Sequence, residues 1–398
     1  MSTGAQLWDI VKRNMMLIVL IFVMILFEVL IRFHTNWMGS LFRPTNITNL
    51  ILQNGYVVIL TCGMLLCILT GGNIDLSIGS MVALIGAIAG VLIVNWELNI
   101  YLAILLCLAV GLLLGSWQAF WIAYVKIPPF IVTLSGMLAF RGISWLILKG
   151  QTISSFPDAF SRYFNSFLPG IDPQNPGQSY YTFTIAVAIV VSLIAVAVQA
   201  GSRVSKVRKG YDVEPLWLML FRLVLTCLVI MVVGHLLGKD KGIPVILILL
   251  AVVVLAYSFF TNNTVPGRRL YAMGGNEKAA RLSGVNTDRL MFFVYTNMGV
   301  LSALAALICV ARFDNAGPQA GMNYELDAIG ACFIGGASAY GGVGTIFGCI
   351  VGAVFMGVLN NGMSLLGMGA DWTRTVKGLV LLAAVVFDVL SQKRKRAN

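Results

Sequence analysis

Residues 46–95 have the sequence NITNLILQNGYVVILTCGMLLCILTGGNIDLSIGSMVALIGAIAGVLIVN. Two long apolar runs, about 46–70 and 77–95, lie on either side of a short glycine-containing segment that carries Asn73 and Asp75. A helix rises about 1.5 Å per residue, so each run is long enough to cross a hydrocarbon core of about 30 Å. This stretch therefore predicts two transmembrane helices joined by a tight polar connection.

The same pattern extends along the whole chain. Of its 398 residues, 59% are hydrophobic and only 11% are charged, whereas a soluble domain has about 45–50% apolar and about 25% charged residues. We predict an all-α polytopic membrane protein with about ten to twelve transmembrane helices, forming a single transmembrane domain over residues 1–398. The twelve hydrophobic elements are about 14–33, 46–70, 77–95, 99–124, 128–148, 181–199, 216–237, 243–260, 290–311, the short segment 326–336, 346–366 and 374–390.

The positive charge is distributed unevenly between the connecting segments. If the N-terminus lies inside, the inner segments carry sixteen of the 27 Lys and Arg residues and the outer segments carry eight. Lys and Arg collect on the cytoplasmic side of membrane proteins. The net charge of +11 is therefore an orientation signal with both termini cytoplasmic, and it does not indicate nucleic-acid binding.

Residues that could catalyse a reaction are scarce. The seven cysteines contain no CxxC pair, and the only histidines, His34 and His235, are far apart in sequence, so we expect no metal site and no cofactor. The chain lacks a GxxxxGK[ST] loop for binding ATP phosphates. We therefore predict a protein that is not an enzyme.

A second glycine-interrupted segment occurs late in the chain. Segment 326–336 is too short to cross the membrane alone, and the glycine-rich residues 335–344 follow it. Irregular backbone at membrane depth is tolerated where protein or a water-filled cavity covers it. Together with residues 69–79, this pattern indicates a possible internal repeat whose two segments meet at a translocation path, as in transporters. Tight loops between closely packed helices remain an equal alternative.

Amide side chains interrupt several of the apolar runs. A buried amide without a partner costs on the order of 1–3 kcal/mol, so each must meet another helix, water or a ligand. An uncharged polyhydroxylated solute would require such groups along its path, although hydrogen bonding between helices is the alternative for each. The predicted path residues are Gln53, Asn54, Asn73, Asp75, Asn297, Asn360 and Asn361. Arg141 also lies within a span and requires carbonyls, a carboxylate or water.

The cytoplasmic loop at about 261–289 contains the signals of a short surface helix. Asn276 suits the N-cap, Glu277 would lie at the positive end of the helix dipole, Arg281 follows at i+4, and Gly284 can end the helix. A helix of about two turns is marginal in water and requires docking. Both a cytoplasmic partner and the inner ends of its own spans could supply that docking.

Five motifs resemble those of one protein family. They match, in family order, the membrane permeases of bacterial ribose-type monosaccharide ABC importers. The additional pair at about 181–237 is similar to the arrangement in xylose or multiple-monosaccharide permeases of the same family. The motifs are Gly72–Ser80, Gly274–Asn286, Tyr324–Ile329, Gly335–Gly344 and Leu359–Gly362.

The resemblance implies a permease of the bacterial inner membrane, with a dimeric pore served by a cytoplasmic ATP-binding subunit and a periplasmic sugar-binding protein. The outer segments 149–180 and 312–327 would meet the binding protein. Two rival functions are an ion-driven secondary sugar carrier and a membrane enzyme acting on a lipid or sugar headgroup. The residues implied in coupling to the ATPase are Gly274, Gly275, Asn276, Glu277, Ala280, Arg281, Ser283 and Gly284.

Overall fold

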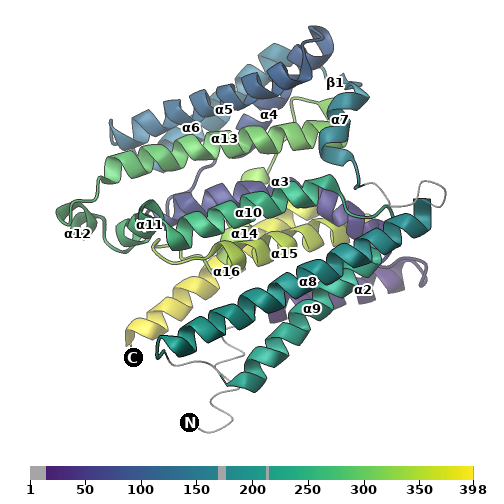
Figure 1. Ribbon diagram of the computed structural model, residues 1–398. Helices are drawn as coiled ribbons and strands as arrows, with labels where there is room; N and C mark the ends of the chain where they lie inside the picture. Colours follow the sequence, from purple (N-terminus) through teal and green to yellow (C-terminus); the bar gives the residue numbers. More distant parts are fainter. Residues whose placement is uncertain (1–14, 169–175, 212–214, 398) are drawn as a thin grey trace.

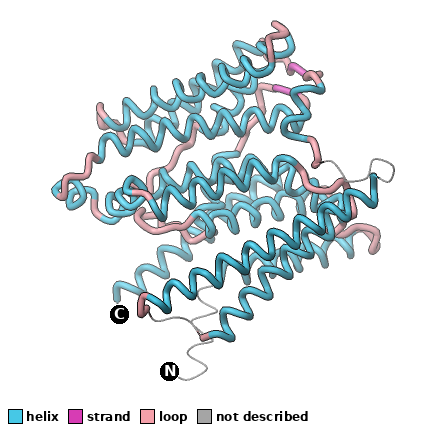
Figure 2. The backbone as a smooth tube through the Cα atoms, in the orientation of Figure 1, coloured by secondary structure: helices cyan, strands magenta, loops and turns pink. Residues whose placement is uncertain are grey.

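A computed structural model describes residues 15–168, 176–211 and 215–397 as a bundle of helices with one small pair of strands (Figures 1 and 2). The elements are α2 (Met15–His34), α3 (Pro44–Leu69), α4 (Ile78–Gly90), which the π-helical η1 (Val91–Asn95) continues, α5 (Ile100–Ala123), α6 (Pro129–Leu148), β1 (Ile153–Ser154), α7 (Asp158–Asn165), α8 (Pro176–Arg208), α9 (Leu216–Gly238), α10 (Val245–Asn263), α11 (Val265–Gly275), α12 (Glu277–Leu282), α13 (Thr287–Phe313), β2 (Asn315–Ala316), α14 (Tyr324–Ile334), α15 (Ile346–Leu365) and α16 (Ala370–Ala397).

Each of the twelve predicted hydrophobic elements coincides with a helix. Within the described residues, ten helices are long and apolar enough to cross a membrane, which confirms the predicted fold class. The segment predicted at 326–336 is α14, a helix of 11 residues. At about 1.5 Å per residue it is too short to cross alone.

The core is formed by α3, α4, α13 and α15, in which most residues of the apolar stretches are buried. α13 packs along α5, α3 and α4, and α14 packs against α15, α3 and α16. Glycines allow the closest approaches: a Cβ atom on Gly111 of α5 would lie 2.6 Å from the carbonyl oxygen of Gly299 in α13. Without a hydrophobic driving force between helices in lipid, such small-residue contacts stabilise helix packing.

The additional pair predicted at 181–237 forms the hairpin of α8 and α9 at the edge of the bundle (Figure 1). Its two helices pack mainly on each other, through Gly234 against Ala188 and a 2.9 Å hydrogen bond between the Tyr181 hydroxyl and His235 Nδ1. No residue in the most apolar window of α9 is buried. The hairpin is therefore an addition at the periphery.

The two ends of the bundle differ in structure. α12 and the C-terminal end of α16 lie at one end, whereas α7 and β1 lie at the other (Figure 1). At the second end β1 pairs antiparallel with β2, with Ile153 opposite Ala316 and Ser154 opposite Asn315. We call these the α12 end and the α7 end.

Candidate coupling and translocation site

The two glycine-interrupted segments, 70–77 and 335–345, meet backbone to backbone. The amide of Gly342 donates a 3.2 Å hydrogen bond to the carbonyl oxygen of Leu69. A Cβ atom on Gly341 would lie 2.8 Å from the carbonyl carbon of Gly71, and one on Gly72 would lie 2.9 Å from that of Ala339. Only glycine permits this approach, because any side chain would separate the two segments.

α11 joins the same contact from the third side. A Cβ atom on Gly274 would lie 2.8 Å from Gly342 Cα and closer still to the carbonyl oxygen of Leu69. The Tyr271 hydroxyl donates a 2.8 Å hydrogen bond to the carbonyl oxygen of Gly344. We call this meeting of α11 with segments 70–77 and 335–345 the glycine junction. The atoms that a Cβ on Gly274 would contact are backbone atoms, which cannot move aside as a flexible side chain can.

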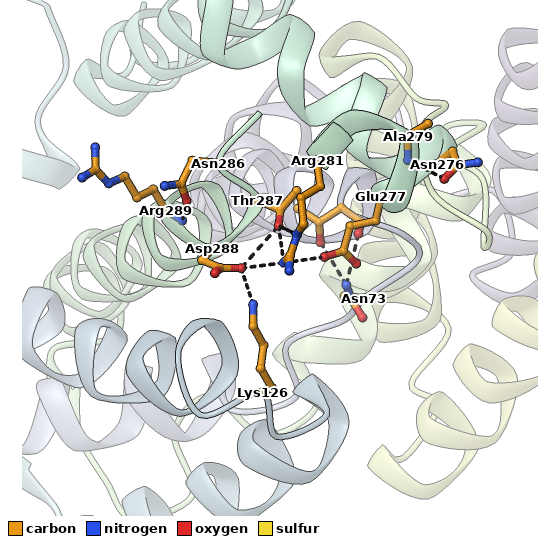
Figure 3. Close-up of polar contacts among 11 residues, drawn as sticks. Asn73, Lys126, Asn276, Glu277, Ala279, Arg281, Asn286, Thr287, Asp288 and Arg289 are labelled. Carbon is orange, nitrogen blue, oxygen red and sulfur yellow. Dashed lines mark hydrogen bonds and ion pairs between the residues drawn. The ribbon is translucent and has the colours of Figure 1, made fainter. Parts of the chain in front are cut away.

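α12 follows the glycine junction directly and forms as its sequence predicts (Figure 3). The side chain of Asn276 accepts a 3.0 Å hydrogen bond from the amide of Ala279, which confirms the predicted N-cap. After the helix, Gly284 adopts a φ of +83°, a left-handed conformation typical of a residue that follows a helix. The predicted short surface helix is therefore confirmed as six residues, Glu277–Leu282.

Arg281 fastens α12 to the first turn of α13. Its Nη2 atom lies 2.8 Å from Asp288 Oδ1 and 2.7 Å from the Thr287 hydroxyl, but 3.5 Å from Glu277 Oε1 (Figure 3). The predicted pair with Glu277 is thus present but is the longest of the three contacts. Asp288 also forms an ion pair with Lys126, in the connection between α5 and α6. A single carboxylate therefore joins α12, α13 and that connection.

The outward surface of α12 is exposed. Ala280 is buried, whereas Leu282 is 90% exposed, and Ser283 and Gly284 are also exposed. Gly275 has open space where a Cβ atom would stand. α12 therefore docks on its own chain, one of the two alternatives that the sequence left open, and docking of a cytoplasmic partner on its exposed surface stays a prediction.

The predicted path amides have different environments. Asn361 of α15 and Asn46 of α3 exchange two hydrogen bonds of 2.9 and 3.0 Å, and the Tyr257 hydroxyl donates a 2.5 Å hydrogen bond to Asn297. Asn54 donates to the carbonyl of Leu50 in its own helix and lines an apolar groove between α3, α10 and α15.

Two other amides in this set lack such helix-to-helix bonds among the described residues. Gln53 is exposed, and the Oδ1 atom of Asn360 is buried without a hydrogen-bond partner in the part of the chain that the structure describes. The assignment of these amides to a path remains a prediction.

Asn73 and Asp75 lie in segment 70–77, next to the glycine junction. Asn73 donates to the hydroxyl of Thr70 at 3.1 Å. Asp75 is fully buried, and its Oδ1 atom accepts hydrogen bonds from the amide and hydroxyl of Ser77. The carboxylate thereby holds the turn that leads into α4. The assignment of both residues to a path stays a prediction.

One buried charge pair was missed by sequence reasoning, which placed Asp327 in an outer segment. Lys377 Nζ of α16 lies 2.7 Å from Asp327 Oδ1 of α14, with side chains that are 11% and 1% exposed. The Tyr56 hydroxyl of α3 donates to Asp327 Oδ2 at 2.9 Å. No local pattern links these three positions, although an intramembrane lysine always requires a partner.

Arg141 has carbonyl partners, one of the options that the sequence left open. Its guanidinium donates to the carbonyl oxygens of Pro318 at 3.0 Å and Ala320 at 2.5 Å. These carbonyls belong to the irregular segment between β2 and α14. Arg141 therefore satisfies backbone groups that have no helical partner. The described residues contain no cluster of His, Cys, Asp and Glu that could hold a metal ion.

Comparisons with known proteins agree with this architecture. The family model described as "Branched-chain amino acid transport system / permease component" matches residues 46–385. The chain is 37% identical over 378 residues to the xylose transport system permease protein of Escherichia coli strain K12, a match that covers 94% of this chain and 93% of the relative. It is 36% identical to the Haemophilus influenzae xylose permease, over 89% and 92% of the two chains. No solved structure matches it.

A ribose permease is also similar. The ribose import permease protein of Escherichia coli strain K12 is 32% identical over 349 residues, 88% of this chain and 87% of the relative. The resemblance to ribose-type and xylose-type permeases is thus confirmed, and so is the prediction of a transport subunit instead of an enzyme. The chain belongs to the permease-component family of ABC transport systems whose model covers residues 46–385, and it is a multi-pass membrane protein of that family.

Proposed function

We propose that this chain is the membrane permease of an ATP-driven importer of a monosaccharide such as xylose, arabinose or galactose. The observation that carries the proposal is the continuous connection from an exposed helix, α12, to both glycine-interrupted segments through Gly274. A permease that performs no chemistry itself requires such a connection to respond to a separate ATPase. Identity of 37% to xylose permeases over most of the chain supports the substrate class.

The cytoplasmic ATP-binding subunit would bind the outward surface of α12. Leu282 offers an apolar anchor, and exposed Glu277 and Lys278 surround it with charge. Arg281 and Asp288 fix the helix to α13, so a force on α12 would move α13 and, through Lys126, the connection between α5 and α6. Among the coupling residues predicted from the sequence, Gly274 supports this role by its contacts in the glycine junction and Arg281 by its bonds to α13, whereas Gly275 makes no such contact.

A periplasmic sugar-binding protein would bind the opposite end of the bundle, the α7 end, where residues 149–168 and 312–323 of the predicted outer segments 149–180 and 312–327 lie. Residues 169–175 of the first segment lie outside the described residues, and the remaining residues begin α8 and α14. The strand pair of β1 and β2 joins these two segments. With the α12 end facing the ATPase, the C-terminal end of α16 is cytoplasmic in the bacterial inner membrane. Residues 1–14 and 398 lie outside the described residues, and we propose that both termini are cytoplasmic. We also propose that two copies form the pore. Protease accessibility of tags at each terminus in right-side-out vesicles tests this orientation.

The decisive experiment reconstitutes the chain with its cognate ATPase and binding protein in proteoliposomes. Uptake of labelled aldopentoses and aldohexoses should require ATP, the binding protein and an intact α12. Mass measurement of the detergent-solubilised complex should give two permease copies. Accumulation of sugar by this chain alone under a proton or sodium gradient would instead establish the rival ion-driven carrier.

A further inference from the structure

Three polar side chains follow one face of α3 from its α7 end to its middle. Asn49, Gln53 and Tyr56 are spaced at i, i+4 and i+7, so they lie on one stripe of the helix. Asn49 and Gln53 are exposed, whereas Tyr56 is buried. α3 begins at Pro44, so Gln53 lies roughly 14 Å along the helix and Tyr56 lies roughly 18 Å along it.

This stripe ends on the buried charge pair. Tyr56 donates to Asp327, which Lys377 neutralises, and the ring of Tyr324 stacks on that of Tyr56 with centroids 3.7 Å apart. These groups come from three helices, α3, α14 and α16. On the far side of Tyr56, Leu60 continues the same helical face and is fully buried. The polar stripe is therefore closed at the middle of α3.

Exposed amides at this depth are unfavourable against lipid. In the hydrocarbon region no solvent satisfies an amide, and polar groups there face a cavity or other protein. Arg312, at the end of α13, donates a 3.1 Å hydrogen bond to Asn49 Oδ1, which adds a cation to the same face. By contrast, Asn54 satisfies its own amide on Leu50, although it is the neighbour of Gln53 in the sequence.

We propose that Asn49, Gln53 and Tyr56 line the outer half of the solute path. The Asp327–Lys377 pair and Tyr56 close the inner end of this half, and we call this closure the floor. The ligand class is an uncharged polyhydroxylated solute, and this identification rests on the proposed function. Amides, hydroxyls and aromatic rings bind sugar hydroxyls and ring faces without a net charge. Opening the floor separates α16 from α14, and solute hydroxyls then replace the contacts of Tyr56.

The first test measures access of water to this stripe, independently of transport. Gln53→Cys in the assembled complex should react from the outside with a membrane-impermeant maleimide. Leu113→Cys, at an exposed apolar position in α5, and Leu60→Cys should react at least about tenfold more slowly, because thiolate forms poorly away from water. Six of the seven native cysteines are buried and Cys227 is half-buried, so background labelling should be small. If Gln53→Cys is labelled no faster than Leu113→Cys, the proposal is overturned.

The second test opens the floor. In the double variant Asp327→Asn with Lys377→Met, no unpaired charge remains in the bilayer, so the complex should assemble as in the wild type. Leu60→Cys in that background should be labelled about ten times faster. If the closed state is destabilised by about 1.4 kcal/mol relative to the open state, the open state is populated about ten times more often. Unchanged labelling at position 60 in an assembled complex would refute the closed floor. Circular dichroism and size-exclusion profiles confirm that assembly.

Measurements of sugar uptake distinguish an error in this inference from an error in the proposed function. Gln53→Leu should raise the KM for uptake of labelled xylose or lower its maximal rate several-fold, whereas Leu113→Ala, at an exposed apolar position in α5, should leave both unchanged. If the wild-type complex transports no aldopentose or aldohexose yet Gln53→Cys is labelled, the proposed substrate class fails while the water-accessible stripe stands. If uptake is normal in both variants, the stripe is not the path although the sugar assignment stands.

Discussion

Gly274 and Gly275 are adjacent in sequence, but they should respond in opposite ways to the addition of a methyl group. Alanine at Gly274 would place its Cβ 2.8 Å from Gly342 Cα and closer to the Leu69 carbonyl, whereas the space beside Gly275 is open. Van der Waals contact of such carbons begins near 3.4 Å, so the three backbones at Gly274 must move apart by more than half an ångström. At Gly275 nothing has to move.

The expected free-energy change follows from two opposing terms. Overpacking typically costs about 1–3 kcal/mol when side chains can adjust, and the upper value applies at Gly274 because its neighbours are backbone atoms. Alanine is favoured over glycine within a helix by about 1 kcal/mol. A net strain of about 2 kcal/mol remains for Gly274→Ala, and none is expected for Gly275→Ala.

Transport is the appropriate measurement for this pair of variants. If the strain falls on one state of the transport cycle, about 2 kcal/mol lowers its population about thirtyfold. ATP-driven sugar uptake by the reconstituted complex should therefore fall at least about tenfold for Gly274→Ala and stay near the wild-type rate for Gly275→Ala. Equal, wild-type rates for both variants, with normal assembly, would refute the role of the glycine junction in transmission.

Three further predictions concern the same regions. Leu282→Asp should weaken binding of the ATP-binding subunit by about tenfold or more, as measured by surface plasmon resonance, because it removes an apolar anchor. The melting temperature of the permease alone should stay the same. Asn361→Leu leaves the Oδ1 atom of Asn46 without a donor, although Nδ2 still donates to the Leu41 carbonyl, and should lower the free energy of unfolding by about 1–3 kcal/mol. The double variant with Asn46→Leu should recover part of this loss, and thermal unfolding in detergent measures it. Lys126→Ala removes an exposed ion pair, so it should change the free energy of unfolding by less than about 1 kcal/mol. It should nevertheless reduce sugar-stimulated ATP hydrolysis, and unchanged hydrolysis would count against a role of Lys126 in coupling.

The hydrophobic elements were predictable because each depends on local composition. The backbone of a long apolar run is satisfied in a membrane only as a helix, and all twelve predicted runs, the short α14 included, are helices. α12 was predictable for the same reason. Its N-cap Asn276, its pair of Glu277 with Arg281 and its Gly284 terminus are interactions within a few residues of one another.

The partners of polar groups depended on tertiary structure. The sequence grouped Gln53 with Asn54 as amides of one span, but the helix turns one outward and the other onto its own backbone. Asp327 and Lys377 are 50 residues apart in sequence, and only the packing of α16 on α14 brings them to 2.7 Å. Residue type therefore predicted that a partner was needed, but could not identify it.

The chain alone determines its membrane spans, its short helix α12 and its family, because these depend on neighbouring residues and ordered motifs. The tertiary structure decides which glycines matter. Gly274 lies against two backbones from other parts of the chain and Gly275 lies beside open space, although the sequence presents them as equivalent. The physical reason is that steric exclusion acts only between atoms that the fold brings within contact distance.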